Sequence, residues 1–209
     1  PADMNGEFLF ALQFLGEDTY TITVEATDSV GNTGSDSGTY TLDFTPPAVA
    51  ITMPADGSST NDTTPTIGGT AEVGAMIVVT VVDDGGNTVD TLMATADMNG
   101  DWSVDVTTPL PEGAYAATAT ATDAAGNSAM TTPTAFIVDT TAPALTFDTP
   151  ADGTVSNDTT PTLSGTVEVG APVVVRVLDD QGNEVQVLAT NELAGTWDAP
   201  ALMLADGTY

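Results

Sequence analysis

The sequence predicts an all-β protein made of tandem copies of one small domain. Three observations support this prediction. Motifs recur about 95 residues apart, apolar and polar residues alternate between turn signals, and no stretch has a helical period of any length. A repeat of about 95 residues is a small domain, because the repeats of solenoid proteins are usually about 20 to 50 residues long.

Two motifs mark the repeat most clearly. The hexapeptide NDTTPT at 61–66 returns 96 positions later at 157–162, and TDSVGN at 27–32 returns as TDAAGN at 122–127. Each copy also has a tyrosine shortly after an acidic residue and a turn, at Tyr20, Tyr115 and Tyr209.

These spacings predict the domain organisation. Residues 46–141 form a complete repeat, residues 1–45 the C-terminal part of a preceding repeat with its strands five to seven, and residues 142–209 the N-terminal part of a third. Because the chain starts and stops inside a repeat, we expect it to be a section of a longer protein. The linkers 43–47 and 139–143 are short and contain proline, which predicts domains stacked nearly end to end.

Seven short strands are predicted in the complete repeat. The first follows two prolines, a loop over 54–62 leads to the second, and a tight turn at Glu72 leads to a nearly continuous apolar run typical of a central sandwich strand. The fifth strand alternates strictly around Trp102, whose ring we expect in the core, as we do those of Phe8 and Trp197. The predicted strands are 48–52, 65–71, 76–82, a segment ending near 94, 102–106, 115–122 and 135–138.

The faces of two strands can be assigned. In the third strand, the position of Thr80 is taken by Arg176 in the next copy, so it faces water. In the sixth strand, threonines alternate with residues expected inside, and these inner residues are Tyr115, Ala117, Ala119 and Ala121.

Seven strands with turn signals every 8 to 12 residues, roughly, predict an immunoglobulin-like sandwich. Tyr20, Tyr115 and Tyr209 each open the sixth strand. This is where a tyrosine corner lies, with its hydroxyl bonded to a backbone group at the bend. The chain has no Cys, so the disulfide of antibody domains is missing.

The charge of the chain restricts its partners. With 30 acidic residues, one basic residue and no His, the net charge is −29. This excludes a conventional nucleic-acid binder, since phosphate contacts need Lys or Arg, and it disfavours anionic lipid. No apolar run is long enough to insert into a membrane. The acidity favours a cation, and oxygen-only ligands indicate Ca²⁺ or Mg²⁺. Alternatively, it only keeps the protein soluble.

Several segments in fixed order resemble the bacterial Ig-like repeats of giant surface adhesins. They are DTTAP at 139–143, PADGT at 150–154, NDTTPTLSGT at 157–166, ATDAAGN at 121–127 and the region of Trp102. The resemblance covers nearly the whole chain. It implies a secreted, calcium-stiffened stalk of tandem domains on the bacterial cell surface, in proteins of biofilm formation or host attachment. It implies no enzyme activity.

The strand order predicts where metal ligands gather. The turns after strands two, four and six lie beside the preceding linker, and the loops after strands one, three and five lie beside the next. Carboxylates that converge there repel one another unless a cation such as Ca²⁺ joins them. The first junction is predicted to gather Asp43, Glu72, Asp123 and Asn127, with Glu17 as a further ligand. The second is predicted to gather Asp139, Glu168, Asp56, Asp62 and Glu112.

These candidates also have ordinary structural interpretations. Asp123 fits a type I turn that its carboxylate caps, and Asp62 fits a loop closed by an Asx hydrogen bond. Glu72 and its counterpart Glu168 stand in a tight turn with no obvious need of a carboxylate, which favours a ligand. The linker residues are the strongest candidates.

The sequence leaves four functions to consider for this chain. The first is a structural stalk that projects an adhesive region from the cell, its partners being neighbouring repeats of the same chain. The second is a binding module for a carbohydrate or protein. The third is an extracellular filament, in which other copies complete the broken end repeats; one longer chain explains the same ends. An enzyme is unsupported, because without His, Cys or Lys only carboxylate pairs remain for acid–base chemistry, and none stands in a recognisable catalytic frame.

Overall fold

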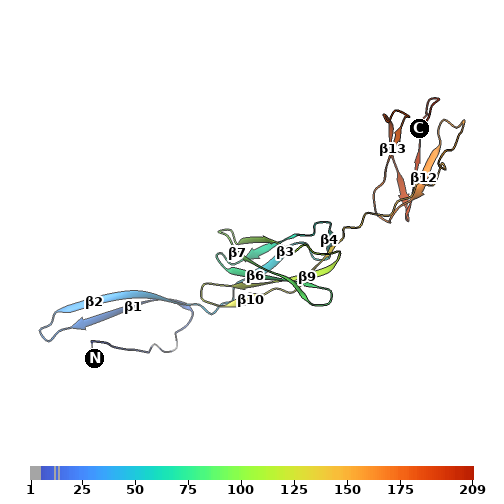
Figure 1. Cartoon of the computed structure of the whole chain (residues 1–209). Helices are drawn as coiled ribbons and strands as arrows, with labels where there is room; N and C mark the ends of the chain where they lie inside the picture. Colours follow the sequence, from blue (N-terminus) through green and yellow to red (C-terminus); the bar gives the residue numbers. More distant parts are fainter. Residues whose placement is uncertain (1–5, 12, 14) are drawn as a thin grey trace. The chain divides into compact units, whose positions relative to one another are not determined.

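A computed structural model describes residues 6–11, 13 and 15–209 of the chain. Every regular element in the described residues is a β-strand (Figure 1). No helix long and apolar enough to span a membrane occurs among them. The chain divides into two compact units, residues 1–140 and 141–209. The first unit contains a two-stranded hairpin and a complete β-sandwich.

Two sheets form the sandwich, and their strand pairs are antiparallel except for β4 with β11. One sheet has three strands in the order β3-β5-β8, and the other has the order β4-β11-β9-β6-β7 with β10 added to β9. The strands are β3 Val49–Met53, β4 Ser58–Thr60, β5 Thr66–Ala71, β6 Met76–Asp83, β7 Thr88–Thr95, β8 Asp101–Asp105, β9 Gly113–Thr122, β10 Ser128–Met130 and β11 Thr134–Val138. Each of the seven predicted strands overlaps one of these, which confirms the all-β, Ig-like sandwich.

Two short strands were not predicted. β4 lies inside the segment 54–62 that the sequence predicts as a loop, and it pairs in parallel with β11 through Ser58↔Phe136 and Thr60↔Val138. β10 pairs with β9 through Ala129↔Ala121. β4 is made only of Ser and Thr, and β10 is three residues long. Neither segment shows an alternation of apolar and polar residues that would predict a strand. Each is a strand only because it pairs with a neighbouring strand.

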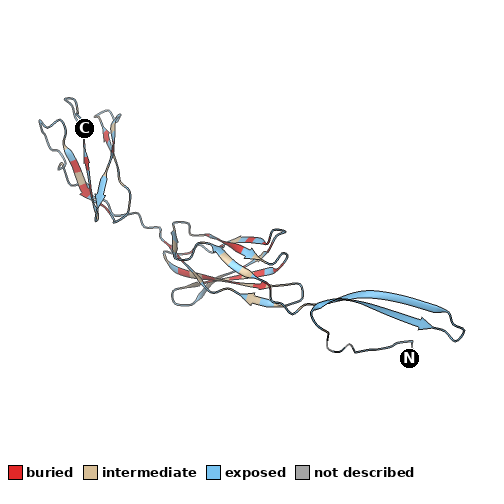
Figure 2. Cartoon of the chain, turned by 180° about the vertical axis from the view of Figure 1, so that it is seen from behind, coloured by how far each residue is buried: buried red, intermediate tan, exposed pale blue. Residues whose placement is uncertain are grey.

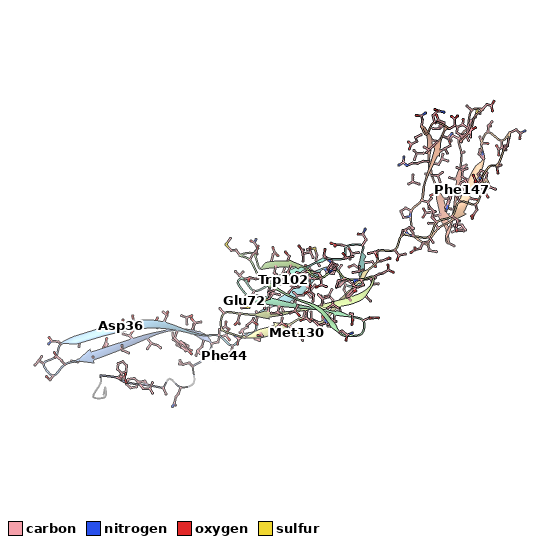
Figure 3. The ribbon with its side chains drawn as sticks, viewed as in Figure 1. Asp36, Phe44, Glu72, Trp102, Met130 and Phe147 are labelled. Carbon is pink, nitrogen blue, oxygen red and sulfur yellow. The ribbon has the colours of Figure 1, made fainter. Side chains whose placement is uncertain are left out.

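The sandwich core is built from the inward positions of both sheets. Ala117, Ala119 and Ala121 are fully buried, as predicted, while the threonines between them are half-buried. Trp102 of β8 is 4% exposed and its indole nitrogen has no hydrogen-bond partner among the described residues (labelled in Figure 3). The other buried members are Ile67, Ala75, Ile77, Val79, Val81, Leu92, Val106, Leu110, Tyr115, Phe136 and Val138.

Strands β3 and β5 approach each other closely at a glycine. A Cβ on Gly69 would lie 1.9 Å from the carbonyl oxygen of Ala50. Gly165 repeats this in the second unit, where a Cβ would lie 2.0 Å from the carbonyl oxygen of Thr146. Only glycine leaves room for the opposing backbone at these two positions.

All three predicted tyrosine corners are present. The hydroxyl of Tyr115 donates to the carbonyl oxygen of Pro111 at 2.8 Å. Tyr20 donates to Gly16 at 2.9 Å, and Tyr209 donates to Ala205 at 3.0 Å, in each case four residues upstream.

The hairpin consists of β1 Asp18–Thr27 and β2 Thr33–Leu42, paired through Tyr20↔Tyr40. Figure 2 shows both of its strands as exposed, in contrast to the sandwich. Phe8 corrects the sequence interpretation: it lies outside any strand and is 54% exposed. Among the described residues no second sheet covers the hairpin, so Phe8 has no core to enter.

The second unit contains part of a similar sandwich. Its strands are β12 Thr162–Thr166, β13 Val174–Leu178, β14 Glu184–Ala189, β15 Asn191–Leu193 and β16 Thr196–Pro200. They form the sheets β12-β16-β15 and β13-β14. Trp197 is 4% exposed, as predicted, and its indole N–H donates to the carbonyl oxygen of Thr146 at 3.1 Å. Arg176 is exposed, also as predicted, and forms an ion pair with Glu184.

Candidate metal site

The first linker is bonded to residues on either side of it. The backbone N–H of Thr45 donates to Asp43 Oδ1 at 2.9 Å, and its hydroxyl donates to both carboxylate oxygens of Glu17 at 2.8 and 2.9 Å. Asn127 Nδ2 donates to the carbonyl oxygen of Asp43 at 3.1 Å and to Asp123 Oδ2 at 2.9 Å. A continuous chain of hydrogen bonds therefore runs from Glu17 to Asp123.

Asp123 caps its own turn. Its Oδ1 accepts hydrogen bonds from the backbone N–H groups of Ala125, Gly126 and Asn127 at 2.9, 2.7 and 2.9 Å. Desolvation acts to raise the pKa of Asp123, but the bonds from Asn127, Gly126 and Ala125 together hold it below its ordinary value. The structural interpretation of Asp123 is therefore correct, and its role as a metal ligand stays a prediction.

The same turn occurs four times, with the pattern Asp-x-x-Gly-Asn. In each copy an Asp carboxylate accepts hydrogen bonds from the backbone and the side chain of the Asn four residues later. Two copies follow the sixth strand of a repeat, and two join β6 to β7 and β13 to β14. The sequence itself carries this pattern at all four places. The four pairs are Asp28–Asn32, Asp83–Asn87, Asp123–Asn127 and Asp179–Asn183.

Glu72 lies in the turn between β5 and β6 (labelled in Figure 3). Its backbone N–H donates to the carbonyl oxygen of Ala48 at 3.1 Å, and its own carbonyl oxygen accepts from Ala75 at 3.0 Å. The turn is therefore closed by backbone bonds, and the carboxylate is exposed. Glu72 is not part of the hydrogen-bond chain that contains Asp43.

At the other end of the sandwich, Thr60 connects two of the predicted residues. Its carbonyl oxygen accepts the N–H of Asp139 at 2.9 Å, and its hydroxyl accepts the N–H of Asp62 at 3.0 Å. Asp62 Oδ1 also accepts from the N–H of Thr64 at 2.8 Å, which is the Asx bond predicted as its structural role.

The remaining candidates of this junction have hydrogen-bond partners of their own. Asp56 Oδ1 accepts from the N–H of Ala135 at 2.9 Å, and Glu112 Oε2 accepts from the hydroxyl of Thr140 at 3.3 Å. Glu168 belongs to the second unit, where its N–H donates to the carbonyl oxygen of Ala144 at 3.0 Å.

No group of three or more acidic side chains among the described residues is close enough to hold a metal ion. The donor chemistry at the first linker nevertheless fits calcium. Glu17, Asp43 and Asp123 supply carboxylate oxygens, Asp43 adds a backbone carbonyl and Asn127 an amide oxygen, and such oxygens are the ligands that Ca²⁺ prefers.

Two family models match the chain. A bacterial Ig-like domain matches residues 52–140, and a bacterial Ig-like domain of group 3 matches residues 5–89. No curated protein matches the sequence.

Two solved structures are similar to the chain. A tetra-tandem repeat from the extending region of a large adhesion protein is 25% identical over 91% of this chain, with a TM-score of 0.42, and the chain spans 50% of that structure. CopC from Methylosinus trichosporium OB3b is 16% identical over 44% of this chain and 90% of its own length, with a TM-score of 0.36. At these TM-scores neither structure defines the fold of this chain. The family match over 52–140 coincides with the sandwich described above, whereas the match over 5–89 begins before the hairpin and ends within β7. Through these two matches, residues 5–140 of the chain belong to the bacterial Ig-like domain family.

Proposed function

We propose that the chain is a structural stalk segment of a large extracellular adhesin on a bacterial surface, and that calcium stiffens its domain junctions. In this role the tandem Ig-like domains carry an adhesive region away from the cell and perform no catalysis. The family membership supports a repeated, surface-exposed module.

The linker before the sandwich is the observation that carries this proposal. Its end is buried, since the side chain of Pro47 is fully enclosed. Its start is bonded to Asn127 through the carbonyl oxygen of Asp43. The linker that leaves the sandwich is also held at its start, because the N–H of Asp139 donates to the carbonyl oxygen of Thr60. A linker that is held against the sandwich at both of its ends suits a load-bearing rod better than a flexible tether.

Calcium would add stiffness at these linkers. Glu17, Asp43, Asp123 and Asn127 would hold the ion at the first linker, with Glu72 as a further ligand from the neighbouring turn. The bound cation supplies positive charge where several carboxylates gather, so that they can approach without repulsion. Asp139, Asp56 and Asp62 would be the candidates of the first unit at the second linker.

Small-angle scattering on a tandem array of several 46–141 repeats tests the proposal. We expect a stiff rod with Ca²⁺ and a chain of shorter maximum dimension with EDTA. Replacing Asp139→Asn and Glu72→Gln in every repeat should remove the difference while each sandwich stays folded.

The matched control removes two charges that do not belong to the predicted ligand sets, through Asp84→Asn and Asp101→Asn. It should keep the response to Ca²⁺. If the maximum dimension of the wild-type array is the same in Ca²⁺ and in EDTA, calcium does not clamp the junctions. An array that bends both in Ca²⁺ and in EDTA would also contradict the proposed role as a rigid stalk.

A further inference from the structure

Within the described residues of the sandwich, the outward face of the larger sheet carries no charged side chain. In β6, β7, β9, β10 and β11, the residues that point away from the core are Met, Val, Ile, Ala, Thr and Ser. The two acidic residues in these strands, Asp83 and Asp90, pair with the inward residues Tyr115 and Val81. The chain as a whole has a net charge of −29, so this face differs from the rest of its surface.

A row of four side chains crosses the middle of this face. Val78 of β6 lies opposite Met93 on one side and Thr120 on the other, and Thr120 lies opposite Met130. Met93 and Met130 are 71% and 69% exposed, whereas Val78 and Thr120 are half-buried (Met130 is labelled in Figure 3). Met76, two residues before Val78, is 56% exposed. We call these five residues the methionine face.

The acidic residues of the sandwich lie elsewhere. The outward face of β8 presents Asp101 and Asp105 on either side of Ser103, and all three are exposed. Most of the other carboxylates lie in the turns, loops and linkers at the ends of the strands. A second copy that approached those surfaces would bring carboxylate against carboxylate, which is repulsive. The methionine face is free of this repulsion.

The corresponding faces of the neighbouring repeats do carry charge. Glu25 takes the place of Thr120 in the preceding repeat, and Arg176 takes the place of Thr80 in the next one. The fold alone therefore does not require an uncharged face, and the complete repeat differs from its neighbours in having one.

The size of the face suits a weak, specific contact. With strands about 4.8 Å apart and about 3.4 Å per residue, four strands over the length of the β6–β9 pairing cover roughly 500 Å². Two such faces would bury roughly 1,000 Å² together, which is at the lower limit for a specific interface. An uncharged surface of this size is also at the upper end of what a monomer usually exposes.

We propose that the methionine face packs on the methionine face of a second copy of this chain, around a two-fold axis. Such a contact brings the same patch of both copies together, so each kind of side chain must suit its own kind. Thioether side chains are flexible and adapt to an opposing surface, and a threonine hydroxyl both donates and accepts hydrogen bonds. Two sheet faces of this kind pack about 10 Å apart, as they do inside a sandwich.

Sedimentation velocity on the 209-residue chain tests the proposal, in EDTA and from about 10 μM to about 1 mM. We expect the mean mass to rise above 21.1 kDa with concentration. The rise should be larger in about 500 mM than in about 50 mM NaCl, because salt screens the repulsion between the two acidic chains while the contact itself holds no charge. EDTA excludes bridging by calcium, so the result does not depend on the calcium proposed at the linkers.

Substitutions locate the contact. Met93→Asp places a carboxylate in both halves of it and should weaken the association at least about a hundredfold, about tenfold for each buried charge. Thr120→Glu, which copies Glu25 of the preceding repeat, should also weaken it. Ser103→Asp, on the outward face of the other sheet, adds the same charge and should leave the association nearly unchanged. Met93 and Ser103 are both exposed, so neither change alters the core.

Methionine oxidation by hydrogen peroxide maps the contact in the unaltered chain, because it converts each accessible thioether to a sulfoxide. The oxidation of Met93 and Met130, measured by mass spectrometry, should slow in proportion to the fraction of dimer as the chain concentration is raised. Met98 is the internal control, since it is 92% exposed in the turn between β7 and β8 and should react at the same rate throughout.

Four outcomes would each overturn the proposal. They are a monomer at every concentration and salt, association that weakens as salt is raised, equal association of the Met93→Asp and Ser103→Asp chains, and oxidation of Met93 and Met130 that does not depend on concentration. A stalk segment does not require self-association, so the proposed function would stand in that case.

Discussion

Tyr115 combines a buried ring with a hydroxyl that leaves the core to reach a backbone carbonyl. Its ring stacks on Phe136 with centroids 5.7 Å apart, and its hydroxyl donates to Pro111. Burial raises the pKa of Tyr115, and the negative charges of Asp83 and Asp84 raise it further. The hydroxyl is thus held in its neutral, donating form.

We expect Tyr115→Phe to destabilise the sandwich by about 1 kcal/mol, the usual net contribution of one hydrogen bond. Urea unfolding followed by Trp102 fluorescence, in a chain carrying Trp197→Phe, measures the loss. Tyr40→Phe is the control and should leave the sandwich unchanged, because Tyr40 lies on the exposed hairpin. If Tyr115→Phe leaves the free energy of unfolding unchanged, the hydroxyl of the corner orients the chain without stabilising it.

Trp102 fills the space between the two sheets of the sandwich. Trp102→Ala should cost roughly 3 to 5 kcal/mol, because it opens a cavity in a closed core. Phe8→Ala at the corresponding position of the preceding copy should have little effect, since Phe8 is exposed. Urea unfolding of both variants makes the comparison. A stable Trp102→Ala protein would contradict the contribution of this buried ring to the stability of the core.

The recurring Asp-x-x-Gly-Asn turn makes the stability of the folded state depend on pH. Hydrogen bonds from the Asn side chain and backbone lower the pKa of Asp28, Asp83 and Asp179 below the ordinary value, and Asp123 is lowered as well. A carboxylate whose pKa is lower in the folded state than in the unfolded state stabilises the fold. This contribution is complete at pH values above the pKa of the unfolded state, which is about 3.9 for Asp. The contribution is lost as the pH falls through the pKa values of the folded state.

We therefore expect the melting temperature to be nearly constant from about pH 7 to pH 5 and to fall below about pH 4. Asp83→Asn should lower the melting temperature at neutral pH and reduce the loss in acid, because the turn then no longer gains from an ionised carboxylate. Asp84→Asn at the next position is the control. Calorimetry across this pH range measures both, and a melting temperature independent of pH would contradict the prediction.

At the scale of the whole molecule, calcium should raise stability and magnesium should raise it much less. Flexible carboxylates on linkers and turns suit the larger ion. With a Kd of about 0.1 mM, a hundredfold excess of Ca²⁺ adds about 2.7 kcal/mol per independent site.

Melting curves in Ca²⁺, Mg²⁺ and EDTA test this. Asp43→Asn should reduce the shift caused by Ca²⁺, and Asp84→Asn should leave it unchanged. Superimposable curves in Ca²⁺ and EDTA would leave solubility as the reason for the net charge of −29.

Much of the architecture was predictable because it depends on local pattern. Apolar alternation located the strands, and the spacing of Tyr20, Tyr115 and Tyr209 located three corners. The turn-capping roles of Asp123 and Asp62 were also foreseen, because an Asp side chain bonds the backbone two to four residues ahead. The metal ligands stay a prediction, because the candidates come from turns distant in sequence and no three acidic side chains converge among the described residues.

The sequence by itself determined the repeat, the all-β class, the strand positions and the corners, because each follows from neighbours along the chain. Tertiary structure decided the rest. β4 exists only because β11 lies beside it, and Asn127 reaches Asp43 only across the fold. β1 and β9 alternate in the same way, yet Ala117 is fully buried and Ile22 is 38% exposed. Alternation states which side chains share a face, and only an opposing sheet decides whether that face is covered.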